Sequence, residues 1–212
     1  MEWFAKFYRD GGPFMHFISM CGIYIFATAI YKFIFLFVKF NTNGANLMNQ
    51  IQKLVLANNV DKAIKLCTAA GDAALAHVLK AGLSRANRGE LEIQTAIEEA
   101  TMEITPKVTK LTDSIPVICG SSTLLGLLGT IQGLILAFEA VANAAPEQKG
   151  ALLANGISMA MNTTGYGLVF AIPGLVLHLI LKGFTNKILN EMDLYSLKLV
   201  NLLVSRDKGS AE

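Results

Sequence analysis

The sequence predicts an all-α membrane protein with three transmembrane helices and long cytoplasmic helical extensions. Of the 212 residues, 53% are hydrophobic and only 16% are charged, which is too apolar for an ordinary soluble domain. Three stretches contain no Asp, Glu, Lys or Arg: residues 11–31, 114–138 and 150–181. Each stretch reaches the ~20 residues that a helix needs to cross a bilayer, and a segment in hydrocarbon must pair its backbone groups internally.

The first predicted span covers residues 14–38 and follows an N-terminal segment, 1–13. Four aromatic side chains in this segment suit the outer membrane interface, namely Trp3, Phe4, Phe7 and Tyr8. A cleaved secretory signal is the alternative, because basic residues precede the apolar run and Ala27–Ala29 resembles a cleavage site. The continuation of the run through 33–38 favours a retained anchor. Lys32 interrupts the run near its end, where a long side chain can reach the headgroups.

The distribution of Lys and Arg predicts the orientation in the membrane. Nine lie between the first two spans, five follow the third, two precede the first, and one lies in the connection 142–149. Because positively charged loops stay in the cytoplasm, we expect an outer N-terminus, a cytoplasmic helical region over 39–112 and a periplasmic hairpin over 142–149. The second and third spans then cover 113–141 and 150–181, and a cytoplasmic C-terminal helix covers 182–212.

The two cytoplasmic extensions are predicted to be helical. Apolar residues recur at helical spacing before Asn58-Asn59 and again after Gly89-Glu90, with these pairs and Gly71-Asp72 as expected turns or caps. Pro106 is a candidate kink in the stem that leads to the second span. An amphipathic pattern continues after the third span, and we expect the two extensions to pack together as a helical bundle.

Composition argues against several functional classes. The net charge of +2, without a patch of aromatic residues among Arg and Lys, argues against a nucleic-acid partner. The three cysteines form no CxxC or Cys/His cluster, so neither a disulfide framework nor a metal site is predicted. The three histidines and the Ser121-Ser122 pair form no nucleophile–base arrangement, and we therefore expect neither an enzyme nor a cofactor.

The second span carries a stripe of small and weakly polar residues. Projected at 100° per residue, several of them fall within about 60° of Thr130, namely Cys119, Thr123, Gly126, Gly133 and Ala137. Gly129 and Gly133 also form a GxxxG pattern, which lets helix backbones approach each other in lipid. Gln132 lies roughly 160° from Thr130, and we expect it to face a neighbouring helix or subunit.

The third span repeats this arrangement around Thr164, and Pro173-Gly174 follow as a candidate hinge. Close helix packing explains either stripe alone, and we assign to it Gly126, Gly129, Gly133 and Gly167. Two threonines near mid-membrane, each in a stripe of small residues, favour a shared and partly hydrated cavity. The candidate residues lining this ion pathway are Thr130, Thr164, Thr123, Ala160, Asn162 and Thr163.

Charged groups are missing from the middle of all three spans. His16 lies near the outer end of the first, Glu139 near the outer end of the second, and His178 near the inner end of the third. A proton relay needs a titratable group along its path. If this chain conducts protons, the central carboxylate must therefore come from another chain.

Two motifs resemble a known family. GLLGTIQGLILAF at 126–138 and TTGYGLVFAIPG at 163–174 are similar to the second and third spans of the MotA/TolQ/ExbB proton-channel family, especially its TolQ/ExbB side. GGPFM at 11–15 and the order of the spans also fit, so the resemblance covers nearly the whole chain. Met159 stands where that side commonly has glutamate, and Thr123 where it often has proline, which leaves the branch open.

The resemblance implies a ring of subunits, usually five, around a pair of single-span partner helices of the TolR/ExbD/MotB kind in the bacterial inner membrane. It implies that the partner carries a membrane aspartate, faced by threonines that correspond to Thr130 and Thr164. Proton-motive force would then drive mechanical work in the envelope, in a Tol-, Ton- or gliding-type system. The alternative is a structural membrane scaffold whose small-residue faces only mediate assembly. Neither stripe offers an ion-specific set of ligands, so the choice between H⁺ and Na⁺ stays open.

Overall fold

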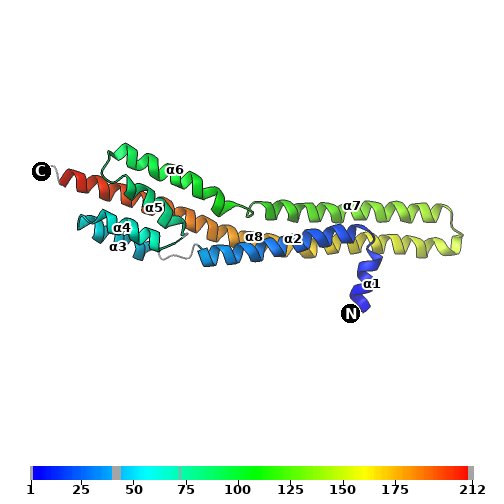
Figure 1. The fold of residues 1–212 in the computed structure, drawn as a ribbon. Helices are drawn as coiled ribbons and strands as arrows, with labels where there is room; N and C mark the ends of the chain where they lie inside the picture. Colours follow the sequence, from blue (N-terminus) through cyan, green and yellow to red (C-terminus); the bar gives the residue numbers. More distant parts are fainter. Residues whose placement is uncertain (1, 40–43, 72, 210–212) are drawn as a thin grey trace. The chain divides into compact units, whose positions relative to one another are not determined.

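The computed structural model describes residues 2–39, 44–71 and 73–209, and this part of the chain is helical without a strand (Figure 1). Expected segments that fall on residues 1, 40–43, 72 and 210–212 lie outside the described residues, as do the side chains of Trp3 and Phe4. In chain order the helices are α1 (Glu2–Asp10), α2 (Phe14–Lys39), α3 (Gly44–Leu56), α4 (Val60–Ala69), α5 (Ala74–Ser84), α6 (Glu90–Thr109), α7 (Ser114–Ala142) and α8 (Pro146–Gly209).

Three helical stretches are long and apolar enough to cross a membrane, which confirms the predicted all-α fold with three candidate spans. They are Phe14–Leu36, Glu90–Ala142 and Pro146–Arg206. The second stretch includes a turn at 110–113, where Leu111 has a φ of 68°. A bulky residue in the left-handed region does not continue a helix, so the stem α6 ends before the spanning helix α7 begins.

The chain forms two compact units. The first comprises Met1–Tyr31 and Leu111–Ile180, and the second comprises Lys32–Lys110 and Leu181–Glu212. Helices α2 and α8 each belong in part to both units. Helix α8 is 64 residues long and passes through Pro173 as one element.

The first unit leaves much of its apolar surface exposed. Large apolar side chains are exposed along all three of its long helices, for example Phe17, Met20, Ile23, Leu127, Ile131, Val169 and Ile172. Continuous apolar surface of this kind marks contact with lipid or with another protein. One buried cluster of this unit has Met15, Ile18 and Tyr166 at its centre, with Phe170 packed against it.

The second unit packs α3, α4, α5 and α6 in sequence order, each against the next. Its fully buried side chains include Ile51, Leu79, Leu83, Ile93, Leu199 and Leu203. The C-terminal part of α8 joins this core, because a Cβ added at Gly82 would lie 3.1 Å from Leu199 Cδ2. The expected packing of the two extensions is thus present.

The turns of the second unit fall at the expected residues. After α3, Asn58 has a φ of 58°, and the Asn59 N–H donates to the Leu54 carbonyl oxygen at 2.9 Å, as in a Schellman ending. Gly71 follows α4 with a φ of 69°, which glycine adopts at little steric cost. Gly89 is the N-cap residue of α6.

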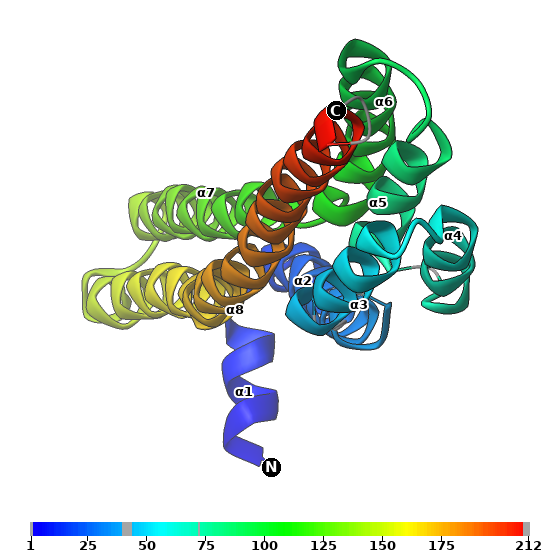
Figure 2. The ribbon, with the colours of Figure 1, turned by 90° about the vertical axis from the view of Figure 1, so that its left-hand side faces the viewer.

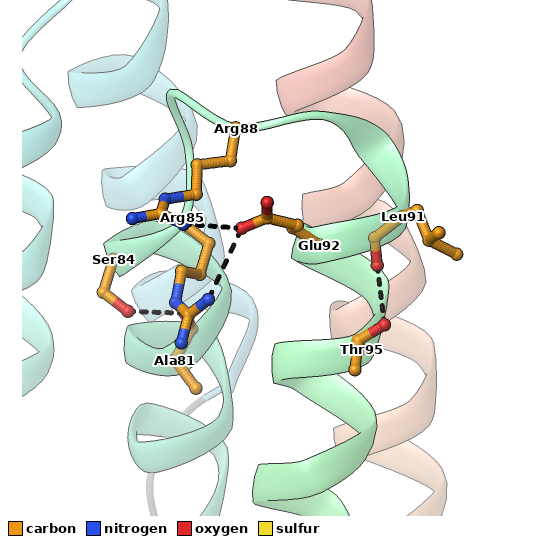
Figure 3. Close-up of polar contacts among 7 residues, drawn as sticks. All are labelled: Ala81, Ser84, Arg85, Arg88, Leu91, Glu92 and Thr95. Carbon is orange, nitrogen blue, oxygen red and sulfur yellow. Dashed lines mark hydrogen bonds and ion pairs between the residues drawn. The ribbon is translucent and has the colours of Figure 1, made fainter.

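The turn between α5 and α6 carries a small cluster of ion pairs (Figure 3). Arg85 Nη1 and Arg88 Nη1 lie 3.4 and 3.1 Å from the same oxygen, Oε2 of Glu92. Farther along α6, the Lys107 ammonium donates to Glu103 at 2.7 Å and lowers the pKa of that carboxyl group. Because these groups are well exposed, the pairs contribute little to stability.

Lys32 is buried, and the expectation that it reaches the headgroups is wrong. The residue is 1% exposed, and its Nζ donates to the Val108 carbonyl oxygen at 2.6 Å. Val108 lies in the last turn of α6, where carbonyl groups lack an intrahelical partner. The ammonium group therefore caps the C-terminal end of α6, where the helix dipole favours a positive charge.

Replacing Lys32 with methionine should lower the melting temperature of the purified protein. The Val108 carbonyl group would lose its partner, and an unsatisfied buried polar group costs ~1–3 kcal/mol. The melting temperature is measured in detergent by size-exclusion chromatography after heating. Lys53→Met, at an exposed lysine of α3, is the matched control and should melt with the wild type. Equal melting of Lys32→Met and Lys53→Met would contradict the capping role.

Cys67 in α4 should be chemically inert. Burial, opposed only in part by the nearby Lys80 charge, raises the pKa of the Cys67 thiol to about 11. Because the thiolate is the reactive form, a water-soluble maleimide at pH 7.5 should label Cys67 far more slowly than an exposed thiol introduced by Ser84→Cys. Peptide mass spectrometry distinguishes the two sites, and equal labelling would show that Cys67 is accessible.

The raised pKa of Cys67 also predicts a pH dependence of stability. The folded pKa lies above the value of an unfolded thiol, so the folded state binds the proton more tightly. The stability that this proton contributes is complete below pH ~9 and is lost as the pH rises to ~11. Cys67→Ala should flatten this decline in melting experiments between these two pH values.

Candidate functional site

Helix α7 and the N-terminal part of α8 form an antiparallel pair whose backbones touch (Figures 1 and 2). A Cβ added at Gly133 would lie 3.0 Å from both the Ala160 nitrogen and the Gly156 carbonyl oxygen. A Cβ added at Gly167 would lie 2.8 Å from the Ser122 carbonyl oxygen. A side chain at Gly167 therefore does not fit at this helix separation, and one at Gly133 would press on the backbone of α8.

We call this contact the α7–α8 seam. It comprises Ser122, Gly126, Gly129, Gly133 and Ala137 of α7 with Gly156, Ala160, Thr163, Thr164 and Gly167 of α8. The seam contains the four glycines to which the sequence assigned a packing role. Their small size removes the side-chain layer that normally separates two helices.

Two hydroxyl groups bridge the seam. Thr164 Oγ1 donates to the Gly126 carbonyl oxygen at 3.2 Å, and Ser122 Oγ donates to the Gly167 carbonyl oxygen at 3.3 Å. Both acceptors lie inside continuous helices, so these bonds add to the intrahelical ones. Interhelical hydrogen bonds of this kind contribute ~0.6–2 kcal/mol in a bilayer.

A groove opens beside the seam and brings together three of the predicted pathway residues. It has a volume of about 460 Å³ and is lined by Thr130, Leu134, Ile157, Ala160, Met161 and Thr164. The threonines come from different helices, and the seam holds them on one side of the pair. The other lining residues are apolar, so the groove is a largely apolar surface that carries two hydroxyl groups.

The hydroxyl groups of the groove already use their hydrogens within the chain. Thr130 Oγ1 donates to the Leu127 carbonyl oxygen at 2.6 Å, and Thr164 Oγ1 donates to Gly126 across the seam. A hydroxyl group has one hydrogen and two lone pairs. The oxygen atoms of Thr130 and Thr164 therefore remain as hydrogen-bond acceptors.

The other predicted pathway residues lie apart from this groove. Thr163 is fully buried, packs against Gly129, and has its hydroxyl 2.8 Å from the carbonyl oxygens of Gly11 and Met159. Thr123 is exposed and donates to its own helix at 3.2 Å, while Asn162 is half-buried beside Thr163. Thr163 thus holds Gly11, just before α2, against α8. It does not share a surface with Thr164.

The candidate hinge residues lie inside the uninterrupted helix α8. Gly174 faces the seam side, where an added Cβ would lie 2.6 Å from Cys119 Sγ. Pro173 lines a shallow apolar groove together with Leu168 and Ile172. A proline inside a helix removes one backbone hydrogen bond, so a hinge at this position stays a prediction.

Sequence reasoning missed a polar network near the start of α2 in the first unit. Tyr8 Oη lies 2.6 Å from His16 Nδ1, and Ser19 Oγ lies 3.5 Å from Tyr8 Oη and 3.0 Å from Tyr166 Oη. Tyr8 and Tyr166 also pack edge to face at 5.8 Å. These contacts attach α1 to α2 and α8. The three-residue spacing of His16 and Ser19, which places them on one helix face, was the available signal.

Two polar residues of the spans have distinct environments. His178 Nδ1 lies 2.9 Å from the Thr112 carbonyl oxygen, just before α7. Gln132 is half-buried, and its Oε1 is a buried atom without a hydrogen-bond partner among the described residues. The described residues contain no group of three or more His, Cys, Asp or Glu that could hold a metal ion.

Comparison with known proteins gives several matches. The model of the MotA/TolQ/ExbB proton channel family matches residues 70–194. Biopolymer transport protein ExbB1 of Vibrio cholerae is 37% identical over 38% of this chain and 35% of that protein. A putative ExbB-like protein 3 of Synechocystis is 32% identical over 61% of this chain and 62% of that protein. A putative ExbB homolog of Methanothermobacter thermautotrophicus is 25% identical over 89% of this chain and 65% of that protein.

The matches therefore span between about a third and just under two thirds of the length of these relatives. Among solved structures, the MotAB complex of C. jejuni includes a chain with 15% identity to this one and a TM-score of 0.45. That match covers 87% of this chain and 79% of the other.

Replacing Gly167 with alanine should separate α7 from α8, because the new Cβ would press on the Ser122 backbone, which cannot rotate away. Such overpacking costs ~1–3 kcal/mol. Gly120→Ala is the matched control, since nothing lies within 4 Å of a Cβ at this helical glycine. Melting temperatures in detergent should fall for Gly167→Ala and stay level or rise for Gly120→Ala. The same result for both variants would refute the requirement for glycine at the seam.

Proposed function

The chain belongs to the MotA/TolQ/ExbB proton channel family, and we propose on this basis that it is a subunit of an ion-driven motor in the bacterial inner membrane. In this role it couples proton-motive force to mechanical work in the cell envelope through a single-span partner. The groove beside the α7–α8 seam is the observation that carries the proposal. It places Thr130 and Thr164 on one open and largely apolar surface, which supports the docking of a partner helix.

The partner supplies the acid that this chain lacks. Residues 114–138 and 150–181 contain no Asp, Glu, Lys or Arg, so these stretches, which include the groove, offer no carboxylate to carry a proton. A proton crossing a membrane needs a titratable group along its path. A partner helix of the TolR/ExbD/MotB kind, with one aspartate at mid-membrane, fits both the apolar lining and the missing charge.

The hydrogen bonds of the two threonines favour the protonated form of that aspartate. The hydroxyl hydrogens are committed to the carbonyl groups of Leu127 and Gly126, which leaves acceptor oxygens in the groove. A protonated carboxyl group donates to such an oxygen, whereas a carboxylate needs donors. The groove therefore binds the proton-loaded aspartate, and loss of the proton weakens its binding. This difference in binding free energy drives the movement of one component relative to the other.

We propose a ring of identical chains, with five as the expected number, around a pair of partner helices. The exposed apolar side chains of α2, α7 and α8 support contact with lipid and with neighbouring copies. The excess of Lys and Arg in 39–112 and after residue 181 supports a cytoplasmic location of both extensions and a periplasmic N-terminus. Whether the driven process is of the Tol, Ton or gliding type depends on the partner.

A structural scaffold is the second candidate, and the seam itself is the observation that favours it. Backbone contact and the two bridging hydroxyl bonds are also what a purely structural helix pair needs. Ion flux in vesicles that contain the chain with and without its partner separates the two functions. A scaffold gives no partner-dependent flux of H⁺ or Na⁺ under any gradient.

Replacing Thr164 with valine should abolish energised function and leave assembly intact. Valine keeps the branched shape but removes the groove oxygen and one seam hydrogen bond of ~0.6–2 kcal/mol. Partner-dependent proton flux in vesicles is the measurement, and it should fall to the level without partner. Normal flux in Thr164→Val, with the partner bound, would remove Thr164 from the pathway.

Two control variants make this experiment specific. Thr164→Ser keeps the hydroxyl group and should retain most of the flux. Ser122→Ala loses a seam hydrogen bond of the same kind, to Gly167, but lies outside the groove lining. It should assemble and conduct. If Ser122→Ala and Thr164→Val fail equally, loss of helix packing accounts for the defect.

A further inference from the structure

Helix α6 carries a second stripe of side chains on the side that faces away from the core of the second unit. The core stripe includes Ile93 and Ile97, both buried. The opposite stripe recurs at the same spacing of three and four residues, and we call it the α6 stripe: Leu91, Thr95, Glu98 and Met102. Its two apolar side chains are 76% and 75% exposed. Single exposed apolar residues are common, so their meaning depends on whether a complementary surface exists.

The end of α8 offers such a surface. Its buried side includes Leu199 and Leu203. Its exposed side forms what we call the α8 stripe: Leu194, Leu197, Lys198 and Asn201. A groove of about 460 Å³ between α3 and α8 borders this stripe, and Lys198 and Asn201 line both. The described lining of the groove contains no Asp or Glu. The α8 stripe thus combines exposed apolar side chains with a positive charge.

The two stripes carry opposite charges that are not neutralised within the chain. Among the described residues, the ion pairs of α6 use Glu92, Glu103 and Lys107, and Glu98 has none. Lys198 likewise has no ion pair in this part of the chain, and its Nζ lies 5.2 Å from the centroid of the Tyr195 ring. A pair of exposed opposite charges contributes little affinity, but it selects the partner surface and the alignment of the two helices.

The charged residues of the two stripes lie at the same level along the second unit. A Cβ added at Gly82 would lie 2.8 Å from Ile97 Cδ1 and 3.1 Å from Leu199 Cδ2, so α6 and α8 are level at these residues. The two helices run in opposite directions, so one step forward on α6 matches one step back on α8 (Figure 1). Glu98 is therefore level with Lys198.

The same alignment holds along the rest of both stripes. Met102 is level with Leu194, because each lies five residues from the pair that contacts Gly82. At the other end, Arg206 Nη2 donates to the Ala86 carbonyl oxygen at 3.0 Å, in the turn that precedes α6, which agrees with this alignment. Apolar side chains of the two stripes thus share a level, as the opposite charges do.

We propose that the α6 stripe of one copy packs against the α8 stripe of the next copy in the ring. Each copy in a ring uses two different surfaces, one for each neighbour. Rotation about an axis parallel to these helices changes no level, so Glu98 meets Lys198 of the next copy and Met102 meets its Leu194. Apolar contact supplies the affinity, and the charge pair sets the alignment. This inference rests on the ring in the proposed function.

Cross-linking between two differently tagged copies tests the contact. One copy carries Met102→Cys, the other carries Leu194→Cys, and both are produced together in the same membranes. A short bis-maleimide should link them into a dimer with both tags. The wild-type mixture should not form this dimer, because Cys67 and Cys119 are buried. Ser84→Cys paired with Leu194→Cys is the matched control, since Ser84 is exposed on α5 but lies outside both stripes, and it should give no dimer.

The pattern of links decides between the possible contacts. Met102→Cys on both copies, or Leu194→Cys on both, should give no dimer, because each stripe meets the other kind. Preferential linking of like variants would overturn the inference. A ring of wild-type chains in native mass spectrometry, without the link between Met102→Cys and Leu194→Cys, would overturn the inference and leave the proposed function standing. Absence of any ring would overturn the proposed ring itself.

Charge reversal tests the role of the ion pair in the same assay. Glu98→Lys or Lys198→Glu should each lower the yield of the linked dimer about two- to fivefold, the range expected for an exposed pair. Both reversals in one chain restore opposite charges and should restore the yield. Lys62→Glu, at an exposed lysine of α4, is the matched control and should leave the yield unchanged. Additive losses in the double variant would refute a direct contact between Glu98 and Lys198.

Discussion

The close approach of the α7 and α8 backbones is the constraint on which the rest of the candidate site depends. Glycine at 133 and 167 lets each helix lie directly against backbone atoms of the other. At this separation the Thr164 hydroxyl reaches the Gly126 carbonyl oxygen, and Thr130 faces the same groove. A side-chain layer between the helices would move the two threonines apart. The glycines therefore act on the site only by setting the distance between the α7 and α8 backbones.

Polar side chains near the ends of the spans bond to backbone groups. In the second unit, the Lys32 ammonium caps the last turn of α6 through the Val108 carbonyl group. In the first unit, the His178 ring binds the Thr112 carbonyl group before α7. Both acceptors lie beside the turn at 110–113, where helical pairing is interrupted and carbonyl groups lack their usual partners. The break between α6 and α7 thus leaves carbonyl groups available to these two side chains.

In the proposed motor, this chain provides neutral surroundings and the partner provides the charge. A carboxylate at mid-membrane would cost several kcal/mol in every subunit, whereas hydroxyl groups bonded to their own backbone cost little. Two acceptor oxygens in an apolar groove distinguish a protonated from an ionised carboxyl group. Selectivity for the proton-loaded state then follows from the direction of the hydrogen bonds, without a fixed charge on this chain.

The sequence by itself determined the three spans, the turns of the second unit, the two small-residue stripes and the family, because each depends on a local pattern. Hydropathy over twenty residues, the 3.6-residue helical period and the turn preferences of Asn and Gly are all readable along one segment. Only the tertiary structure decided that Thr163 is buried while Thr164 lines the groove, that Lys32 points to Val108, and that Tyr8, His16, Ser19 and Tyr166 form one network. These outcomes depend on backbone and side-chain groups far apart in the chain, and no local pattern records which of them meet.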